Sequence, residues 1–526
     1  MPCFFARISL RVQLALALTL ALALALATHA PTYPDTASHN HTDLESLFRP
    51  VLSPGAQILY PSGPNWTDRI QQRWSAYQAP SYSGAIRVAT VADVQNIIQL
   101  ANAHDIPYLA TGAGHGVSAT LATLHAGINI DLSDFRYAHL SPAGDRLTVG
   151  GGTKFQEMWD VLYAAGKEIQ TGAAQCVGAL GATLGAGIGP LQGRRGLMID
   201  ALESATLVTA TGEVVTASQT ENADLFWGLR GAGWNFGVVV EATYNVYEAT
   251  NAGQLLEGDM LFAASANASV WETLREFDGE GLSDVLALTV VLGWNPGLDM
   301  ATILVNIIYY GPPEAAEPYI QRFRALGPLR ERVTPVLAWN KLYTKLFFSE
   351  DPSPCEHDLR LIYGGAGLKR TDVPTFVEYT DLFAAFAREY QGRIAASVVF
   401  SRFPTQAVRD VDDAEDMAYA FREIETHVLF KATFVDADDA VEEGVNAWVV
   451  QSREWFARTS GFEDSDRQGQ LVLYNNYAHG DEGPEVWYGK QNLVRLAALK
   501  RKWDPFEKFS FYHPVPVDYG VESWRD

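Results

Sequence analysis

The sequence predicts an α+β protein built from two domains. Helices and strands alternate from about Ile86 onward, and three glycine-rich loops adjoin strands between residues 111 and 237. From about residue 251, long β-rich runs replace the short strands, which indicates a second domain with its own sheet. A chain of 526 residues, 48% of them hydrophobic, has enough apolar material for more than one core.

The first residues have the pattern of a secretory signal peptide. Arg7 and Arg11 precede an apolar run, Val12 to Ala27, and small residues offer cleavage after Ala27 or Ala30. An uncleaved membrane anchor is the rival interpretation, but the run is short for a span of ~20 residues. We therefore expect a signal peptide at residues 1–27, a protein secreted or held in the secretory-pathway lumen, and no membrane span after its removal. Residues 28–77, rich in Pro and Ser, are predicted to form an N-terminal arm outside the core.

Three sequons and few cysteines fit a secretory route. Asn40, Asn65 and Asn267 are the predicted N-glycosylation sites. Because Cys3 lies in the leader, the mature chain keeps only Cys176 and Cys355, so at most one internal disulfide forms. Whether those two cysteines pair stays open at this point.

The acidic charge balance excludes one class of partner. The formal net charge is −23, and a leader with two arginines and no acidic residue leaves −25. Binding to nucleic acid requires a basic surface, so we expect none. No His, Cys, Asp and Glu grouping has metal-ligand spacing, so no metal site is predicted. We expect a monomer that takes a small-molecule substrate.

The first domain is predicted from capping and periodicity. Thr90 and Asp93 form a capping box at the start of a helix whose apolar face recurs at helical spacing. Thr153 is expected to cap a second helix that carries Phe155 and Trp159. Strands are expected at Ile106–Ala110, Gly127–Leu132, Leu147–Val149 and Val238–Tyr247, with a hairpin at Thr206–Ala217 that turns at Thr211-Gly212.

The second domain is predicted to present an antiparallel sheet as one wall of a cleft. Its strands are expected at Leu286–Leu292, Thr302–Tyr310 and Ala395–Phe400, and its helices at Pro313–Leu326 and Asp436–Val449. The last 55 residues contain Leu471–Tyr477 and a basic helix, Gln491–Lys502. From the residues alone, that segment completes either domain.

The most informative motif is the loop Thr111-Gly-Ala-Gly-His115-Gly116. Its glycines allow positive φ and close approach to a ligand, and its free N–H groups suit a pyrophosphate. A Rossmann fingerprint would require a helix to begin at this loop, but Val117 to Asn129 shows no apolar stripe and leads into another strand. A denser cluster, Gly178 to Gly189, and a third loop, Gly231 to Gly237, favour a cofactor cradle.

An ordered series of motifs places these loops in a known family. The series comprises Ala110–Gly116, Val177-Gly178 leading to Leu184–Gly189, Gly196-Leu197 with Asp200, Asp224–Gly231 running into Asn235–Val238, Tyr474–Tyr477, and Lys500 followed by Trp503-Asp-Pro505 and Phe509. On these motifs the chain, from about residue 78 to 526, resembles FAD-linked oxidoreductases of the berberine bridge enzyme type, within the vanillyl-alcohol oxidase group.

The resemblance implies a domain plan and a cofactor site. A two-lobed PCMH-type FAD-binding domain spans residues 78–250, a substrate domain with an antiparallel sheet spans 251–470, and a berberine-bridge-type segment, 471–526, returns to the FAD domain. His115 is the residue linked to the 8α-methyl of the flavin, since a neutral imidazole nitrogen is a competent nucleophile. A hydrogen-bonding histidine with non-covalent FAD is the alternative. The other implied FAD-binding residues are Thr111, Gly112, Ala113, Gly114, Gly116, Gly178, Gly185, Gly187, Gly189, Asn235, Gly237, Val238 and Asn476.

One departure from the family concerns the second tether that many relatives carry. Their cysteine stands three residues before the Val-Gly pair, where this chain has Ala174, and Cys176 is displaced by two residues. We therefore expect one covalent flavin bond, no cysteinyl link, and Cys176 packed as a small buried residue.

The resemblance also implies the reaction. A substrate C–H bond gives hydride to the flavin while a base takes the partner proton, and O2 reoxidises the flavin to give H2O2. Tyr474 and Tyr477 are the candidate catalytic bases, although both fit simple packing equally well; His427 and His479 are weaker candidates. Ile188 stands where some relatives have a tyrosine.

The form of the Thr111–Gly116 loop resembles that of the family's fungal secondary-metabolite branch, and this resemblance implies a secondary-metabolite intermediate as the substrate. A carbohydrate (oligosaccharide) oxidase is the alternative within the family. A flavin-carrying binding protein with little turnover, and a dehydrogenase that uses another acceptor, also stay open.

Overall fold

The computed structural model describes residues 43–64, 66–351, 353–411, 417–462 and 471–520. The chain divides into Met1–Asp43 and a compact unit, Leu44–Asp526, and the architecture below is that of the second unit. The expected leader and the sequons at Asn40 and Asn65 lie outside the described residues. Asn267 is half-buried at the first position of helix α10 (Asn267–Arg275).

A four-stranded sheet forms the first lobe, in the order β1-β2-β4-β3. Its strands are β1 (Gln57–Leu59), β2 (Tyr82–Arg87), β3 (Tyr108–Thr111) and β4 (Gly127–Asp131). Strand β2 runs parallel to β4, as does β3, while β1 is antiparallel to β2. The predicted capping box is confirmed: Thr90 and Asp93 cap α4 (Val91–Ala103), whose apolar face packs on this sheet.

Part of the expected arm belongs to this core. Leu44 and Phe48 of α2 (Leu44–Phe48) are fully buried against the first lobe, and β1 extends its sheet. The prediction of an arm outside the core was therefore wrong for these residues. The apolar residues of this segment do not recur at a helical or strand period, so the sequence did not indicate that Leu44 and Phe48 are buried. Tertiary packing buries them.

The second lobe is a five-stranded antiparallel sheet in the order β5-β6-β10-β8-β9. Its strands are β5 (Ala138–Leu140), β6 (Arg146–Gly150), β8 (Leu202–Val208), β9 (Val214–Ser218) and β10 (Val238–Asn245). The predicted hairpin is confirmed by the pairing of Val208 with Val214. A short pair joins β7 (Lys167–Glu168) to β11 (Tyr247–Glu248). The helices of this part of the chain are α5 (Phe155–Ala164), α6 (Ala179–Gly185), α7 (Gln192–Arg195), α8 (Met198–Ala201) and α9 (Ala223–Ala232), whereas the short α3 (Trp66–Arg69) precedes β2 of the first lobe.

The cap of α5 differs from the prediction by one residue. Lys154 is the N-cap, and its backbone N–H donates to Glu157, while the hydroxyl of Thr153 donates to the carbonyl of Tyr137. The expected cap at Thr153 was wrong because this hydroxyl ties the loop to the neighbouring strand instead. The expected apolar face, with Phe155 and Trp159 on it, is buried.

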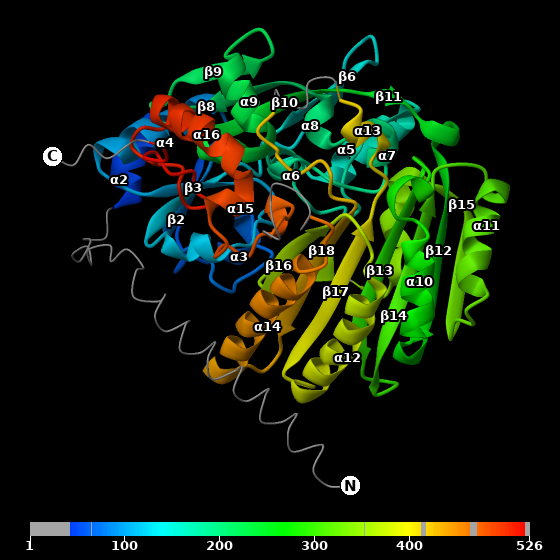
Figure 1. The fold of residues 1–526 in the computed structure, drawn as a ribbon. Coiled ribbons are helices and arrows are strands. Elements are labelled where there is room, and N and C mark those ends of the chain that lie inside the picture. Colours follow the sequence, from blue (N-terminus) through cyan, green and yellow to red (C-terminus); the bar gives the residue numbers. More distant parts are fainter. Residues whose placement is uncertain (1–42, 65, 352, 412–416, 463–470, 521–526) are drawn as a thin grey trace. The chain divides into compact units, whose positions relative to one another are not determined.

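A seven-stranded antiparallel sheet forms the substrate domain, in the order β15-β12-β14-β13-β17-β18-β16. Its strands are β12 (Gln254–Ala263), β13 (Leu286–Asn295), β14 (Met300–Tyr309), β15 (Arg330–Ala338), β16 (Leu361–Leu368), β17 (Ile394–Arg402) and β18 (Thr426–Phe434). Figure 1 shows α10, α12 (Val373–Glu389) and α14 (Asp439–Ala457) side by side along one face of this sheet, with α11 (Pro313–Arg324) beyond α10. A short α13 (Gln406–Arg409) follows β17.

Alternation along these strands gives the sheet two different faces. Val290, Val305 and Phe400 join the core under the helices. Their neighbours Thr289, Asn306 and Ser401 face a cavity on the other side. The sheet is thus one wall of a cleft, as the sequence predicted.

The C-terminal segment returns to the first two lobes. Helices α15 (Pro484–Tyr488) and α16 (Lys490–Trp503) contact each other, and α16 packs on α9. Figure 1 shows this orange-to-red segment beside the blue and green elements of the first domain. The buried ammonium of Lys500 bonds to Asp504 and to the carbonyl of Asn235. The predicted fold class is confirmed. Within the described residues, no helix combines the length and the apolarity needed to cross a membrane.

Candidate functional site

A cavity of about 1020 Å³ lies between the glycine loops and the seven-stranded sheet. Clefts that bury drug-sized ligands measure roughly 300–1,000 Å³. This cavity is therefore at the upper end of that range, which fits a site shared by a large cofactor and a substrate. The predicted site residues that line it are Thr111, Gly112, Ala113, Gly114, His115, Gly116, Gly178, Gly189, Gly237, Val238, Tyr474, Asn476 and Tyr477.

The glycine loops approach other backbone too closely for a side chain. Gly114 has φ +76°, and a Cβ there would stand 2.3 Å from the carbonyl oxygen of Gln72. A Cβ on Gly178 would stand 2.9 Å from that of Ala113, so the first and second loops meet without side chains between them. No α-helix begins at the first loop: a 3-10 turn (Ala119–Thr123) leads into β4, as the sequence indicated.

Three predicted cofactor residues do not line the cavity. Gly185 leaves room for the side chain of Asn476, since a Cβ there would lie 1.8 Å from its Oδ1. The N–H of Gly187 donates to the phenol oxygen of Tyr474. Asn235 is buried and donates to the carbonyl of His513, while its Oδ1 accepts from the N–H of Val515. These three residues support the residues that line the cavity without lining it themselves.

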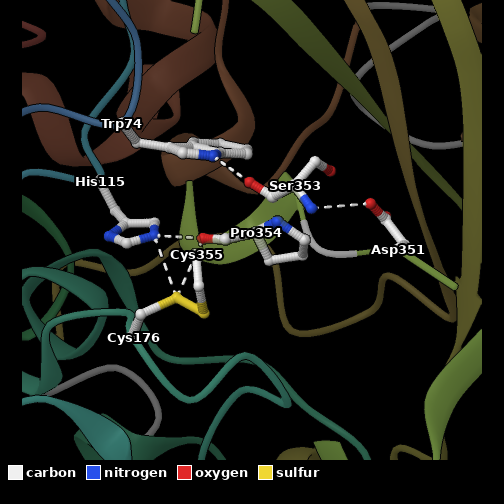
Figure 2. The surroundings of a disulfide bond; sticks show 7 residues. All are labelled: Trp74, His115, Cys176, Asp351, Ser353, Pro354 and Cys355. Atoms are coloured by element: carbon white, nitrogen blue, oxygen red, sulfur yellow. Dashed lines mark hydrogen bonds between the residues drawn. A yellow bond between two sulfur atoms is a disulfide. The ribbon is translucent and has the colours of Figure 1, made fainter. Parts of the chain in front are cut away.

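His115 is held in one orientation (Figure 2). Its Nε2 lies 2.8 Å from the carbonyl oxygen of Pro354. Because a carbonyl only accepts, Nε2 carries the proton and Nδ1 carries the lone pair. Nδ1 is buried without a hydrogen-bond partner among the described residues. Burial lowers the pKa of His115 to about 4, against the opposing effect of the Pro354 carbonyl, so the ring is neutral near pH 7.

The indole of Trp74 stacks on the imidazole, with ring centroids 5.4 Å apart and 23° between the planes. Trp74 also donates from Nε1 to the carbonyl of Ser353, 2.7 Å away. His115 is therefore packed between the segment at residue 74 and the loop at residues 353–355.

Cys176 and Cys355 form a disulfide beside His115 (Figure 2). The prediction of Cys176 as a small packed residue was wrong, because its sulfur is half-buried and bonded to the substrate domain. Cys176 Sγ lies 3.7 Å from His115 Nε2 and 3.0 Å from the Pro354 oxygen. The bond joins the glycine-loop domain to the loop that carries Pro354.

The candidate bases lie on the 3-10 turn Asn475–Tyr477 and the residue before it. Tyr474 and Tyr477 stand edge to face, with centroids 5.0 Å apart. Burial raises the pKa of Tyr474 well above its usual value and that of Tyr477 to about 12, so both are phenols at neutral pH. Nδ2 of Asn476 donates to the oxygen of Tyr474. The weaker candidates His427 and His479 do not line the cavity.

The wall from the sheet combines apolar and polar side chains. Ile308, Val399 and Leu429 line it, and Ile188 adds an apolar contact from the glycine side. The polar groups on this wall are Thr289, Asn306, Ser401 and Lys431.

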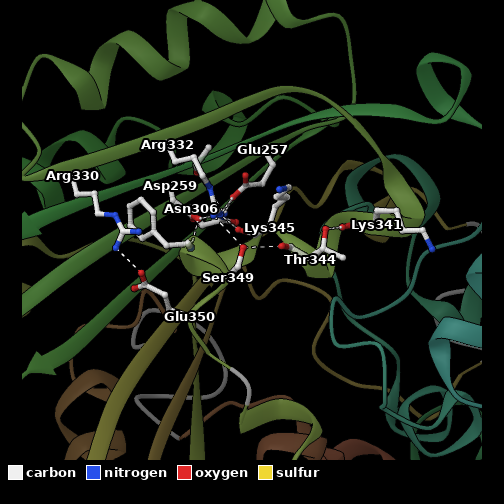
Figure 3. Close-up of polar contacts among 12 residues, drawn as sticks. Glu257, Asp259, Asn306, Arg330, Arg332, Lys341, Thr344, Lys345, Ser349 and Glu350 are labelled. Atoms are coloured by element: carbon white, nitrogen blue, oxygen red, sulfur yellow. Dashed lines mark hydrogen bonds and ion pairs between the residues drawn. The ribbon is translucent and has the colours of Figure 1, made fainter.

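A buried polar cluster surrounds Asn306 on the same face of the sheet (Figure 3). Asn306 donates to Asp259 and Glu257, and Arg332 pairs with Asp259 at 2.8 Å. Burial, and then the neighbouring Asp259, raise the pKa of Glu257 to about 9, so Glu257 is neutral at pH 7. Asp259 also accepts from the N–H of Phe348 and so anchors the loop whose Phe347 reaches the cavity.

Sequence reasoning missed Trp74, Tyr363, Lys431 and Tyr512, all of which line the cavity. Trp74 lies in the segment taken for an arm, and the strand alternation in β16 and β18 was the available signal for Tyr363 and Lys431. Among the aromatic residues between 251 and 350, Trp271, Tyr310 and Trp339 lie in cores, while Phe347 lines the cavity.

Comparison with known proteins shows the family to which the chain belongs. Residues 82–218 match the FAD binding domain family, and residues 473–516 match the family described as berberine and berberine like. The FAD-linked oxidoreductase azaL of Aspergillus niger is 41% identical over 470 residues, covering 89% of this chain and 97% of that protein. The chain belongs to the berberine-bridge-type FAD-linked oxidoreductases.

Solved structures share the fold of this oxidoreductase. Xylooligosaccharide oxidase from Myceliophthora thermophila C1, in complex with xylobiose, superposes with a TM-score of 0.74 at 22% identity, covering 90% of this chain and 99% of its own. Glucooligosaccharide oxidase from Acremonium strictum, whose FAD is 6-S-cysteinyl and 8α-N1-histidyl, gives 0.73 at 16% identity, with coverage of 90% and 99%. The enzyme is therefore a flavoprotein oxidoreductase whose cavity fits FAD: a glycine cradle without side chains faces one buried, unpaired imidazole nitrogen.

Proposed function

We propose that this oxidoreductase is an oxidase that removes hydride from an organic substrate, a secondary-metabolite intermediate, with FAD bound covalently through His115. The observation that carries the proposal is the juxtaposition in one cavity of His115, with a free Nδ1, and the phenols of Tyr474 and Tyr477. When bound, the flavin supplies hydride acceptance, and O2 restores it with release of H2O2.

The residues of the chain would bind the cofactor, accept the substrate proton and exclude water. The Thr111–Gly116 loop and Gly178 bring backbone N–H groups to the cofactor side of the cavity, where an anionic pyrophosphate would be held. Asn476 fixes the phenol of Tyr474 by a 2.9 Å hydrogen bond. Tyr474 or Tyr477 would take the substrate proton as hydride leaves. The apolar residues of the sheet exclude water from that step.

The cavity as a whole has more apolar than polar surface, which favours a ring-bearing metabolite over a sugar. An oligosaccharide presents many hydroxyl groups, which require matching polar partners when they are buried. The sheet offers four polar side chains, Thr289, Asn306, Ser401 and Lys431, beside Ile308, Val399 and Leu429. The alternative, a carbohydrate oxidase, is favoured by the structural neighbours, which act on xylooligosaccharide and glucooligosaccharide.

Secretion is part of this proposal. A disulfide persists in oxidising compartments, and Cys176 and Cys355 form one. Glycosylation at Asn267, Asn40 and Asn65 and removal of residues 1–27 would follow from the same route.

The test is to purify the secreted chain and bleach its flavin anaerobically against a panel of phenolic and polyketide-type alcohols and of oligosaccharides. We expect bleaching by an aromatic alcohol and H2O2 on admission of air. Bleaching only by oligosaccharides would support the alternative substrate class. A protein whose flavin no donor bleaches would be a binding protein, and slow reoxidation in air would make it a dehydrogenase.

A further inference from the structure

The Pro354 carbonyl that meets His115 is held by contacts from both domains (Figure 2). On one side of Pro354, the carbonyl of Ser353 accepts a hydrogen bond from Trp74. The hydroxyl of Ser353 accepts another, at 2.9 Å, from Lys431. On the other side, Cys355 is bonded to Cys176. A three-residue segment is thus fixed at both ends, with its central carbonyl directed at Nε2 of the imidazole.

This arrangement decides which nitrogen of His115 is available. The carbonyl fixes the proton on Nε2 and fixes the rotation of the ring, so the lone pair of Nδ1 keeps one direction. Such a partner on the far nitrogen orients an imidazole in metal sites in the same way. Without it, either nitrogen could present its lone pair and the ring could turn.

We propose that the Cys176–Cys355 disulfide is a positioning element for covalent flavin attachment: it holds the Pro354 carbonyl against His115 so that Nδ1 forms the bond. The inference rests on the proposed His115 link. Neither cysteine touches the flavin in this scheme, because each sulfur already carries its second bond. Cys176, which is displaced by two residues from the family's flavin-linked cysteine, thus has a different role in this proposal.

The attachment step balances without involving the disulfide. One C–H bond of the flavin 8-methyl would break, with its proton released and its electron pair passing into the ring system. The Nδ1 lone pair would form the new N–C bond, and the cationic imidazole would then release the proton on Nε2. Dioxygen would accept the two electrons gained by the ring system together with two protons to form H2O2, and the disulfide is neither consumed nor formed.

The test compares wild-type protein with Cys176→Ser, Cys355→Ser and the double variant, each incubated with excess FAD in air. Total bound flavin is read from absorbance, and covalent flavin from fluorescence of the denatured chain. We expect all three variants to bind FAD but to attach it about tenfold more slowly, the effect of one lost orienting hydrogen bond. Asp358→Asn, at an exposed position just after this segment that does not line the cavity, should match wild type.

A second readout distinguishes a loss of His115 orientation from a general loss of structure around the site. NMR of the flavin peptide identifies the attached nitrogen: wild type should give Nδ1 only, and the serine variants a mixture with Nε2. Wild-type attachment rates and a pure Nδ1 link in the variants would overturn the proposal. If wild type itself carries no covalent flavin although its disulfide is intact, the His115 link fails instead.

A third measurement needs no variant and covers the case in which the serine variants do not fold. Wild-type protein made in a partly reducing compartment is sorted by intact mass after thiol alkylation. Covalent flavin confined to disulfide-bonded molecules supports the proposal. Equal covalent flavin on molecules with free thiols overturns it.

Discussion

Asn476 donates a hydrogen bond from Nδ2 to the phenol oxygen of Tyr474 across 2.9 Å, and the N–H of Gly187 donates to the same oxygen across 3.3 Å. Two donors on one oxygen stabilise the phenolate relative to the phenol, whereas burial opposes ionisation and here dominates. Tyr474 is thus a protonated phenol in a site already arranged for negative charge.

Replacement of that hydroxyl tests its role. We expect Tyr474→Phe to slow anaerobic flavin reduction by about 10²–10⁴-fold with bound flavin unchanged. Because the pKa of the base lies above neutrality, the wild-type reduction rate should rise with pH through the neutral and alkaline range. If Tyr477→Phe alone abolishes this rise, Tyr477 is the base. Full activity in both variants would exclude a tyrosine base.

Acid stability should depend on His427. This side chain is buried, and burial lowers its pKa to about 3. The unfolded chain binds a proton at this residue below about pH 6.5, whereas the folded chain does not until about pH 3, so stability falls as pH decreases through that window. His427→Gln should reduce the slope of unfolding free energy against pH by about 1.4 kcal/mol per pH unit. Urea denaturation from pH 7 to 5 measures it; exposed His125→Gln should leave the slope unchanged, and an unchanged slope in His427→Gln would contradict the account.

The glycine cradle should not tolerate a side chain. Gly114→Ala would place a Cβ 2.3 Å from backbone and at φ +76°, so the loop must move. We expect loss of FAD binding and destabilisation by about 1–3 kcal/mol. Gly293→Ala in β13 is the control, because its Cβ would meet nothing within 4 Å. If Gly114→Ala and Gly293→Ala contained equal amounts of FAD, the assignment of the glycine loop to FAD binding would be wrong.

We expect the polar cluster around Asp259 to affect substrate binding more than flavin binding. Asp259→Asn removes the nearer of the two carboxyl groups beside Arg332 and weakens the anchor of the Phe347 loop. We expect destabilisation by about 2 kcal/mol and a higher KM. Glu257→Gln is the matched control, since Glu257 is already neutral at pH 7. Covalent flavin should persist in both. If the KM of Asp259→Asn equalled that of wild type, the Phe347 loop would have no role in substrate binding.

Local patterns predicted much of this fold, and tertiary pairing decided the rest. The capping box at Thr90, the hairpin at Thr211-Gly212 and the non-Rossmann course of the first glycine loop followed from short-range chemistry. Trp74 could not be placed, because its stacking on His115 depends on a segment without periodicity.

The cysteine pair shows the same limit at the site. Cys176 and Cys355 are 179 residues apart, and nothing local in either segment indicates that the two domains bring them together. Likewise, the tautomer of His115 depends on Pro354, which no motif marks.

The central claim is that His115 carries the flavin. Peptide mass spectrometry of the proteolysed protein tests it most directly. The account predicts that the peptide containing His115 is heavier by one FAD less two hydrogen atoms, with the fragment ions placing the addition on His115. An unmodified His115 peptide from yellow, fully flavin-loaded protein would contradict it.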